Sequence, residues 1–163
     1  MGSTKKPYFP MFVDLSDKKV VVAGAGTIAK RRIRVLADFT NRLVVIAPEV
    51  NRELKDMEAE GRITILRRMC GEEDLLGAAL VIAATNDGRL NQEIYAACQR
   101  LGIPANVCND KSRCDFYFPG IAVNDSVVVG VNSGGHASRR ARGVLQQIQE
   151  LLQEPDGTKE QGV

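Results

Sequence analysis

Residues 19–29 read KVVVAGAGTIA, and this stretch decides the fold. Its first half, Lys19 to Ala23, is a continuous β-branched run, which predicts a strand buried on both faces, as in a parallel sheet. Its second half, Gly24 to Ala29, fits the pattern GxGxxG/A, whose glycines let the backbone approach a dinucleotide pyrophosphate while the following helix offers its amides. The alternative is a tight strand–helix turn without a ligand. The position in the first strand–helix–strand unit favours cofactor binding.

The rest of the chain alternates in the same way before its pattern changes. Buried strands are predicted at 43–47, 63–66, 80–84 and 103–108, with helical segments at 49–60 and 90–101 and a short turn near 75. This alternation predicts an α/β fold, a Rossmann-like parallel sheet with helices on both faces. Residues 116–123 and 127–131, joined by Asn124-Asp125-Ser126, then predict an antiparallel β-hairpin, followed by a helix over about 137–152.

We therefore expect three parts: an NAD-binding Rossmann domain at 1–113, a hairpin–helix dimerisation segment at 114–153 and a flexible tail at 154–163. The apolar stripe of the last helix is too long for a tail, so we expect residues 116–152 to form a homodimer interface.

The composition excludes several classes of protein. With a net charge of +2 over 163 residues, binding to nucleic acid through electrostatics is disfavoured. The longest apolar run, 78–84, is too short to span a membrane, and no signal peptide follows Met1. The four cysteines lack metal-binding spacing and indicate reduced thiols in the cytoplasm, and the single histidine, His136, excludes a multi-histidine metal site.

The candidate cofactor-binding residues follow the first, second and fourth strands. They are Gly24, Gly26, Thr27, Ile28, Ala47, Pro48, Thr85 and Asn86. The usual ribose-binding acid is missing, because the second strand runs into Pro48 and Glu49 comes late. Since no arginine lies directly at this tip, we prefer NAD over NADP. The polar residues after the fourth strand could equally form a helix N-cap.

Several segments resemble the precorrin-2 dehydrogenase family of siroheme synthesis. They are FVDL at 12–15, GAGTIAKRR at 24–32, VIAPE at 45–49, AATND at 83–87, NV at 106–107, CDFYFP at 114–119 and NSGG at 132–135, together with Asn91 and Asp110. The resemblance implies that NAD takes a hydride from precorrin-2, a proton is lost and sirohydrochlorin forms. Some family members also insert iron or cobalt into the ring. It also implies a small C-terminal helical domain that these residues do not contain.

The resemblance further implies an aspartate just beyond the Asn-Val of the fifth strand as general base. That region reads Asn109-Asp110, so we predict Asp110 as the catalytic residue, with Asp115 as an alternative that could be structural. Without the resemblance, Asp110 would be interpreted as a turn residue.

A substrate with eight carboxylates requires basic side chains and backbone donors. We predict Arg113, Ser133, Gly134 and Arg139 as substrate-binding residues and no resident metal. Further basic candidates are Arg31, Arg32, Arg140 and Arg142. Arginines at the start of the last helix oppose its dipole, and binding of an anion would explain them, although a solvated face is an equal alternative.

Two other functions fit parts of the sequence. A non-enzymatic NAD-sensing module would share the glycine loop and the parallel sheet, but such modules usually keep the acid after the second strand. A small-alcohol dehydrogenase would need a Tyr-xxx-Lys pair, and Tyr95 and Tyr117 are followed four positions later by Gln99 and Ile121.

Overall fold

The computed structural model describes residues 8–125, 127–134 and 137–153. The chain divides into two compact units. One unit is Phe12–Phe116, and the other consists of the described residues before Phe12 and after Phe116. This division falls close to the predicted boundary after residue 113, and it groups the N-terminal arm with the hairpin rather than with the sheet.

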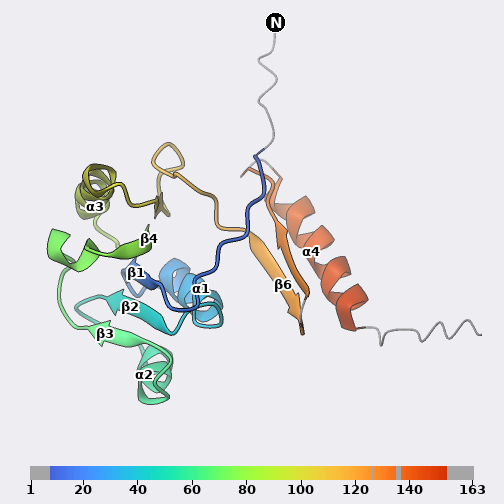
Figure 1. The fold of residues 1–163 in the computed structure, drawn as a ribbon, viewed down its shortest axis with the longest axis horizontal. Helices are drawn as coiled ribbons and strands as arrows, with labels where there is room; N and C mark the ends of the chain where they lie inside the picture. Colours follow the sequence, from blue (N-terminus) through green and yellow to red (C-terminus); the bar gives the residue numbers. More distant parts are fainter. Residues whose placement is uncertain (1–7, 126, 135–136, 154–163) are drawn as a thin grey trace, which may run out of the picture. The chain divides into compact units, whose positions relative to one another are not determined.

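The first unit is built on the predicted parallel sheet (Figure 1). Its five strands run in the order β3-β2-β1-β4-β5, and all pairs are parallel. The strands are β1 (Lys19–Ala23), β2 (Arg42–Ile46), β3 (Thr64–Leu66), β4 (Ala78–Ala83) and β5 (Ala105–Val107). Val20, Val21 and Val22 are 0% exposed, as the continuous apolar run of β1 predicts.

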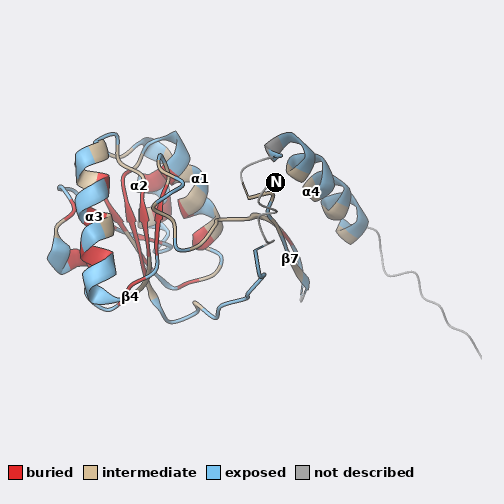
Figure 2. Cartoon of the chain, turned by 90° about the horizontal axis from the view of Figure 1, so that it is seen from above, coloured by how far each residue is buried: buried red, intermediate tan, exposed pale blue. Residues whose placement is uncertain are grey.

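The helices are α1 (Thr27–Leu36), α2 (Arg52–Ala59) and α3 (Gly88–Leu101), with a 3-10 turn η1 at Glu72–Leu75. Figure 2 shows α1 and α3 on opposite sides of the buried strands. The chain moves outward from β1 through β2 to β3 and then crosses back to β4 on the other side of β1. Because such crossovers are right-handed, this reversal places the helices on both faces, and the direction of winding changes between β1 and β4.

An ion pair between the exposed Arg68 and the buried Asp74 holds the crossover between β3 and β4. Arg68 donates to both carboxylate oxygens of Asp74 at 2.6 and 2.5 Å, and the Gly71 amide donates to the same carboxylate at 2.9 Å. At the start of β1, the Lys19 ammonium donates to the main-chain oxygens of Asp74 and Leu76 at 2.8 and 3.0 Å. The Asp74 side chain is 6% exposed, so its charge is compensated almost entirely by protein groups.

The second unit is the predicted hairpin followed by a helix. Strands β6 (Gly120–Asn124) and β7 (Val127–Val131) are antiparallel, and α4 spans Ser138–Gln153. Asp125 adopts the left-handed φ of 47° that the turn requires and that aspartate tolerates. The predicted start of the first strand at 116 is wrong: β6 begins at Gly120, directly after Pro119, which has no amide hydrogen for a ladder.

One face of the hairpin packs on α4. A side chain at Gly120 would lie 2.8 Å from a Leu145 methyl group, Ala122 is buried, and the Asn124 side-chain amide donates to the Leu152 oxygen. Val123, on the other face, is 54% exposed. Among the described residues, none of the helices is long and apolar enough to cross a membrane. The predicted tail at 154–163 lies outside the described residues.

Candidate functional site

The loops at the carboxyl edge of the sheet are joined by backbone hydrogen bonds that continue beyond the strands. The Gly24 amide donates to the Ile46 oxygen at 2.8 Å, and the Ala84 amide donates to the Ala23 oxygen at 2.8 Å. The Cys108 amide donates to the Ala83 oxygen at 2.9 Å. The loops that follow β1, β2, β4 and β5 therefore lie together at one edge, where open α/β sheets bind ligands.

The first glycine of the loop is required by the fold. Gly24 has a φ of 111°, and a Cβ atom there would lie 2.4 Å from the Ala84 oxygen. The loop after β1 and the loop after β4 thus touch through main-chain atoms, and any side chain at Gly24 would force them apart.

The second glycine is not required by the protein itself. Gly26 has an ordinary extended conformation, with φ of −70° and ψ of −177°. The nearest atom to a Cβ built there is Asn86 Oδ1 at 3.9 Å, an ordinary contact distance. Ala29, the small third position of the motif, is fully buried. The open space over Gly26 suits the close approach of a pyrophosphate.

The N-terminus of α1 is free to receive an anion. Within the described part of the chain, Gly26 offers no side-chain cap, and the first turn of α1 contains no acid. In contrast, Asn51 caps α2 through a 3.1 Å bond from the Leu54 amide, and Asp87 caps α3 through bonds from the Arg89 and Leu90 amides at 2.8 and 3.1 Å. The partial positive charge of α1 is therefore not neutralised by its own sequence.

The loop after β2 contains one acidic residue, Glu49. Ala47 is buried, and Pro48 and Glu49 are exposed. Glu53, at the start of α2, pairs with Arg34 and with Lys30, and chiefly the hydrogen bond from Arg34 lowers the pKa of Glu53 to about 2. The Glu53 carboxylate therefore links α2 to α1 through these two ion pairs.

The loop after β4 contains Thr85 and Asn86, and the cap interpretation of this region is confirmed for Asp87. The buried side chain of Asn91 fixes this loop by accepting a hydrogen bond from the Thr85 amide at 3.1 Å. Asn91 is one of the residues that resemble the family, but the sequence alone does not predict its structural role, because the local pattern does not show which backbone atoms Asn91 contacts.

Asp110 lies in the loop after β5 and is tied into that loop. Its Oδ1 accepts from the Ser112 amide at 2.9 Å and from the Ser112 hydroxyl at 2.6 Å, and its Oδ2 lies 3.3 Å from Arg113. The bonds from Ser112, followed by the charge of Arg113, lower the pKa of Asp110. The carboxylate is ionised, as a general base must be, and it also shows the geometry of a turn residue.

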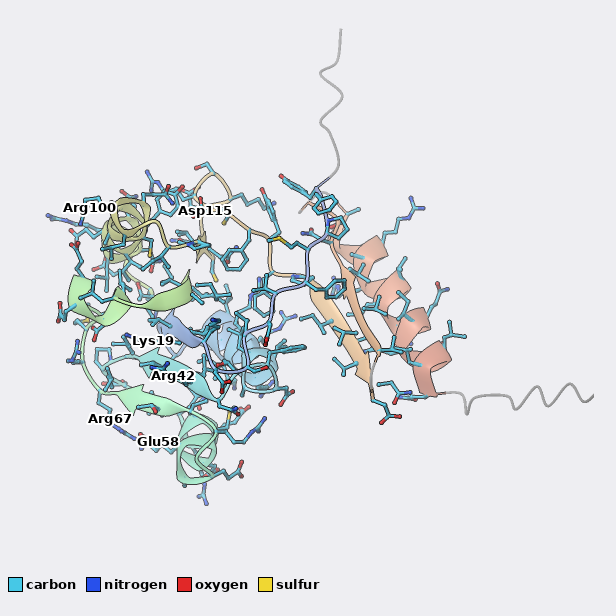
Figure 3. All side chains as sticks on the ribbon, in the orientation of Figure 1. Lys19, Arg42, Glu58, Arg67, Arg100 and Asp115 are labelled. Carbon is cyan, nitrogen blue, oxygen red and sulfur yellow. The ribbon has the colours of Figure 1, made fainter. Side chains whose placement is uncertain are left out.

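Asp115, labelled in Figure 3, has a structural role. Its Oδ2 accepts from Gln99 Nε2 and from the Ala105 amide, both at 2.9 Å. These bonds fasten the segment after the loop to α3 and to β5. Asp110 is therefore the better candidate base.

Two further basic residues lie on α1. Arg31 is exposed, whereas Arg32 is half-buried, and this burial lowers the pKa of its guanidinium. The Cys108 thiol lies beside Arg32, so this cation is turned toward the loop after β5. All four cysteines are free.

The other predicted substrate-binding residues belong to the second unit. The Gly134 amide donates to Asn132 Oδ1 at 2.7 Å, and Gly134 has a φ of 62°. Arg139, Arg140 and Arg142 are exposed on α4, and Ser133 precedes it. Substrate binding by these residues and by Arg113 stays a prediction, and Gly135 and His136 lie outside the described residues.

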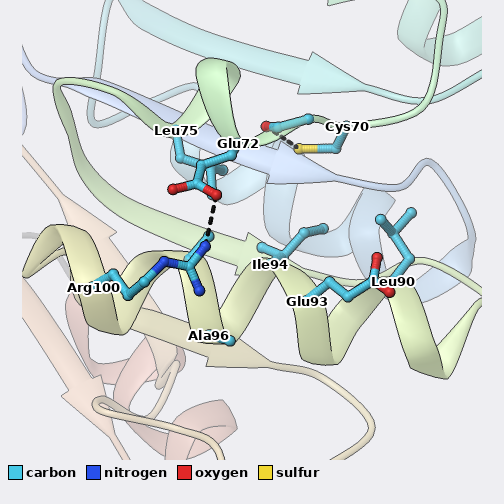
Figure 4. Close-up of a pocket in the computed structure, with 10 residues that line it drawn as sticks. Cys70, Glu72, Leu75, Leu90, Glu93, Ile94, Ala96 and Arg100 are labelled. Carbon is cyan, nitrogen blue, oxygen red and sulfur yellow. Dashed lines mark hydrogen bonds and ion pairs between the residues drawn. The ribbon is translucent and has the colours of Figure 1, made fainter.

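A cavity of about 320 Å³ lies between η1 and α3, away from these loops (Figure 4). It is lined by Cys70, Leu75, Leu90, Ile94 and other residues, and an ion pair between Arg100 and Glu72 at 2.6 Å spans it. None of the residues predicted to bind cofactor or substrate lines it. Across the described ranges, no group of three or more His, Cys, Asp or Glu side chains could hold a metal ion.

Known proteins are similar to this chain in sequence and in fold. A family model described as "Putative NAD(P)-binding" matches residues 11–120. The siroheme synthase of Pseudomonas putida (strain W619) is 42% identical over 135 residues, which are 83% of this chain and 29% of that protein. The siroheme synthase of Ectopseudomonas mendocina (strain ymp) is 39% identical over 142 residues, which are 87% of this chain and 30% of that protein.

Among solved structures, the chain is similar to SirC, a precorrin-2 dehydrogenase. The TM-score is 0.72 at 25% identity, and the alignment covers 88% of this chain and 71% of that one. The chain thus spans less than a third of the curated siroheme synthases and most of SirC. Since the family model and these relatives cover the parallel sheet with its glycine loop, the chain belongs to the NAD(P)-binding family of siroheme synthase N-terminal domains and SirC precorrin-2 dehydrogenase.

Proposed function

We propose that this chain is a cytoplasmic NAD-dependent precorrin-2 dehydrogenase, which oxidises precorrin-2 to sirohydrochlorin in siroheme synthesis. The observation that carries the proposal is the open N-terminus of α1. The protein itself leaves room for a side chain at Gly26, yet the residue there is glycine. Among the described residues, no side chain caps the first amides of α1. Similarity to siroheme synthases and to SirC, a precorrin-2 dehydrogenase, indicates precorrin-2 as the substrate.

The residues at the carboxyl edge have distinct roles in this proposal. Gly24, Gly26, Thr27 and Ile28 hold the pyrophosphate, Ala47 and Pro48 border the adenosine, and Thr85 and Asn86 lie along the nicotinamide side. NAD, when bound, accepts the hydride from the macrocycle. A direct comparison of NADH and NADPH affinities tests the preference for NAD, and tighter binding of NADPH would overturn it.

The proton released with the hydride goes to Asp110. The ionised carboxylate can accept it, but its hydrogen bonds and Arg113 make it a weak base in the free protein. A substrate carboxylate that pairs with Arg113 would draw this cation away from Asp110 and raise the pKa of the base when substrate is bound. Arg32, Ser133, Gly134 and Arg139 are the further groups we assign to the substrate carboxylates.

The hairpin and α4 form the proposed homodimer interface. A two-stranded hairpin is marginally stable alone, and its face opposite α4 carries Ile121, Val123 and Val128. A second copy of the chain would cover these side chains. Light scattering should therefore give twice the mass of one 17.8 kDa chain, and a mass of one chain would contradict the interface.

The deciding experiment mixes the protein with NAD and freshly generated precorrin-2 and follows NADH absorbance, with Asp110→Asn and Asp115→Asn as matched variants. NADH formation by the wild type and by Asp115→Asn, but not by Asp110→Asn, supports the proposal. Formation by all three moves the base elsewhere. Nucleotide binding without turnover favours the alternative function, an NAD-sensing module. Added Fe²⁺ or Co²⁺ tests whether the product ring also receives a metal.

A further inference from the structure

Asn91 joins two loops of the candidate site. The residue is 1% exposed. Its Oδ1 accepts from the Thr85 amide at 3.1 Å and from the Thr85 hydroxyl at 2.7 Å. Its Nδ2 donates to the Thr85 oxygen at 3.1 Å and to Asn109 Oδ1 at 3.4 Å. These bonds use both acceptor positions and both donor hydrogens of the amide.

The backbone partners fix the direction of this side chain. The Thr85 amide can only donate and the Thr85 oxygen can only accept, so the Asn91 oxygen must face the first and its nitrogen must face the second. An aspartate of the same shape would turn a carboxylate oxygen toward the Thr85 oxygen, and an alanine would leave the Thr85 amide without this partner. The position therefore requires asparagine.

The first loop that Asn91 contacts is the loop after β4, which packs against the glycine loop at 24–29. Residue Ala84 lies against Gly24, since its oxygen would be 2.4 Å from a Cβ there. The next side chain along, Asn86, provides the nearest atom to the open space at Gly26. A nucleotide on α1 thus lies beside the segment that Asn91 fixes.

The second loop carries the candidate base. Asn109 is exposed and directly precedes Asp110, whose amide donates to the Val107 oxygen at 3.1 Å. The Asn109 side chain faces the start of α3, where its Nδ2 lies 3.8 Å from a Cβ built at Gly88 and its Oδ1 meets Asn91. The Asp110 carboxylate instead contacts Ser112 and Arg113.

We infer that Asn91 is a positioning residue that couples nucleotide binding along Thr85 and Asn86 to the order of the loop at 108–113, with Asn109 as the link. This inference rests on the proposed binding of NAD. The inference adds a side-chain connection from the loop after β4 to the loop that carries Asp110. The motif at 83–87 and the segment at 106–110 do not show this connection by themselves. A merely structural Asn91 would stabilise the loop after β4 without making the loop after β5 respond to nucleotide.

The test measures amide hydrogen exchange with and without saturating NADH, together with the NADH dissociation constant. Asn109→Ala removes the link at an exposed position. Asn109→Asp keeps an acceptor for Asn91 Nδ2, and Asn41→Ala is the matched control at an exposed asparagine before β2, at the opposite edge of the sheet. In the wild type, NADH should slow exchange in both 84–91 and 108–113.

In Asn109→Ala, we expect the NADH dissociation constant to stay within about twofold of the wild type, while the slowing at 108–113 falls to less than about half. Asn109→Asp should restore the slowing, and Asn41→Ala should match the wild type. Equal slowing at 108–113 in Asn109→Ala and the wild type overturns the coupling. So does NADH binding that leaves 108–113 of the wild type unprotected, although the proposed function then stands. Failure of the wild type to bind NADH overturns both.

Discussion

The two glycines of the loop should respond in opposite ways to the same substitution. Gly26→Ala places a methyl group 3.9 Å from Asn86 Oδ1, in a backbone conformation that alanine adopts freely. Exchanging glycine for alanine at a helix N-cap costs about 0.5–1 kcal/mol, so the melting temperature should fall by no more than about 4 °C. The same methyl group occupies the space where the pyrophosphate must approach. We expect NADH to bind at least about tenfold more weakly, a loss of about 1.4 kcal/mol.

Gly24→Ala should instead damage the fold. Its Cβ would lie 2.4 Å from the Ala84 oxygen at a φ of 111°. The strained φ costs about 1–3 kcal/mol and the forced separation of the two loops a further 1–3 kcal/mol. At about 2–4 °C for each kcal/mol, the melting temperature should fall by roughly 4–24 °C.

Circular dichroism melts and NADH fluorescence titrations of both variants form the assay. The expected pattern is a stable Gly26→Ala that has lost nucleotide and a destabilised Gly24→Ala. A Gly26→Ala variant that binds NADH as the wild type does would refute the placement of the pyrophosphate on α1. A Gly26→Ala variant that unfolds would refute the packing argument.

Three further predictions concern charged and thiol groups. The hydrogen bond from Arg68 lowers the pKa of Asp74. The ionised Asp74 carboxylate therefore stabilises the folded protein above about pH 4, and this stabilisation is lost as the pH falls through the lower pKa of the folded state. In urea unfolding at pH 7, Asp74→Asn should lower the free energy of unfolding by about 1.5–3 kcal/mol. The difference in unfolding free energy between variant and wild type should disappear below about pH 4, and a difference that stays constant with pH would contradict this prediction. Because Ser112 lowers the pKa of Asp110 in the free protein, kcat/KM should show no titration of Asp110 between about pH 5 and 8. Ser112→Ala should move the acid limb of kcat/KM to higher pH, and an unmoved limb would count against Asp110 as the base. Burial raises the pKa of Cys70 to about 12 and of Cys98 to about 11, so iodoacetamide at pH 8 should leave both unmodified in the native protein by mass spectrometry, and rapid alkylation of either would show that the core opens.

The sequence by itself determined the parallel sheet and the place of the cofactor loops, because those signals are local. The apolar run of β1, the glycines after it and the stripe that buries Ile94 and Cys98 on α3 are each readable within one element. Turn chemistry likewise located the hairpin, although the start of β6 was misplaced.

Only the tertiary structure decided the roles of the polar side chains. The sequence ranked Asp110 above Asp115 as the base but could not show what Asp115 contacts, because the donors to Asp115 come from α3 and β5, and these meet only after folding. The link from Asn91 to Asn109 depends in the same way on parallel strands that bring two distant loops to one edge of the sheet. Strand and helix patterns follow from neighbours in the chain, whereas a hydrogen-bond partner far along the chain is set by the register of the whole sheet.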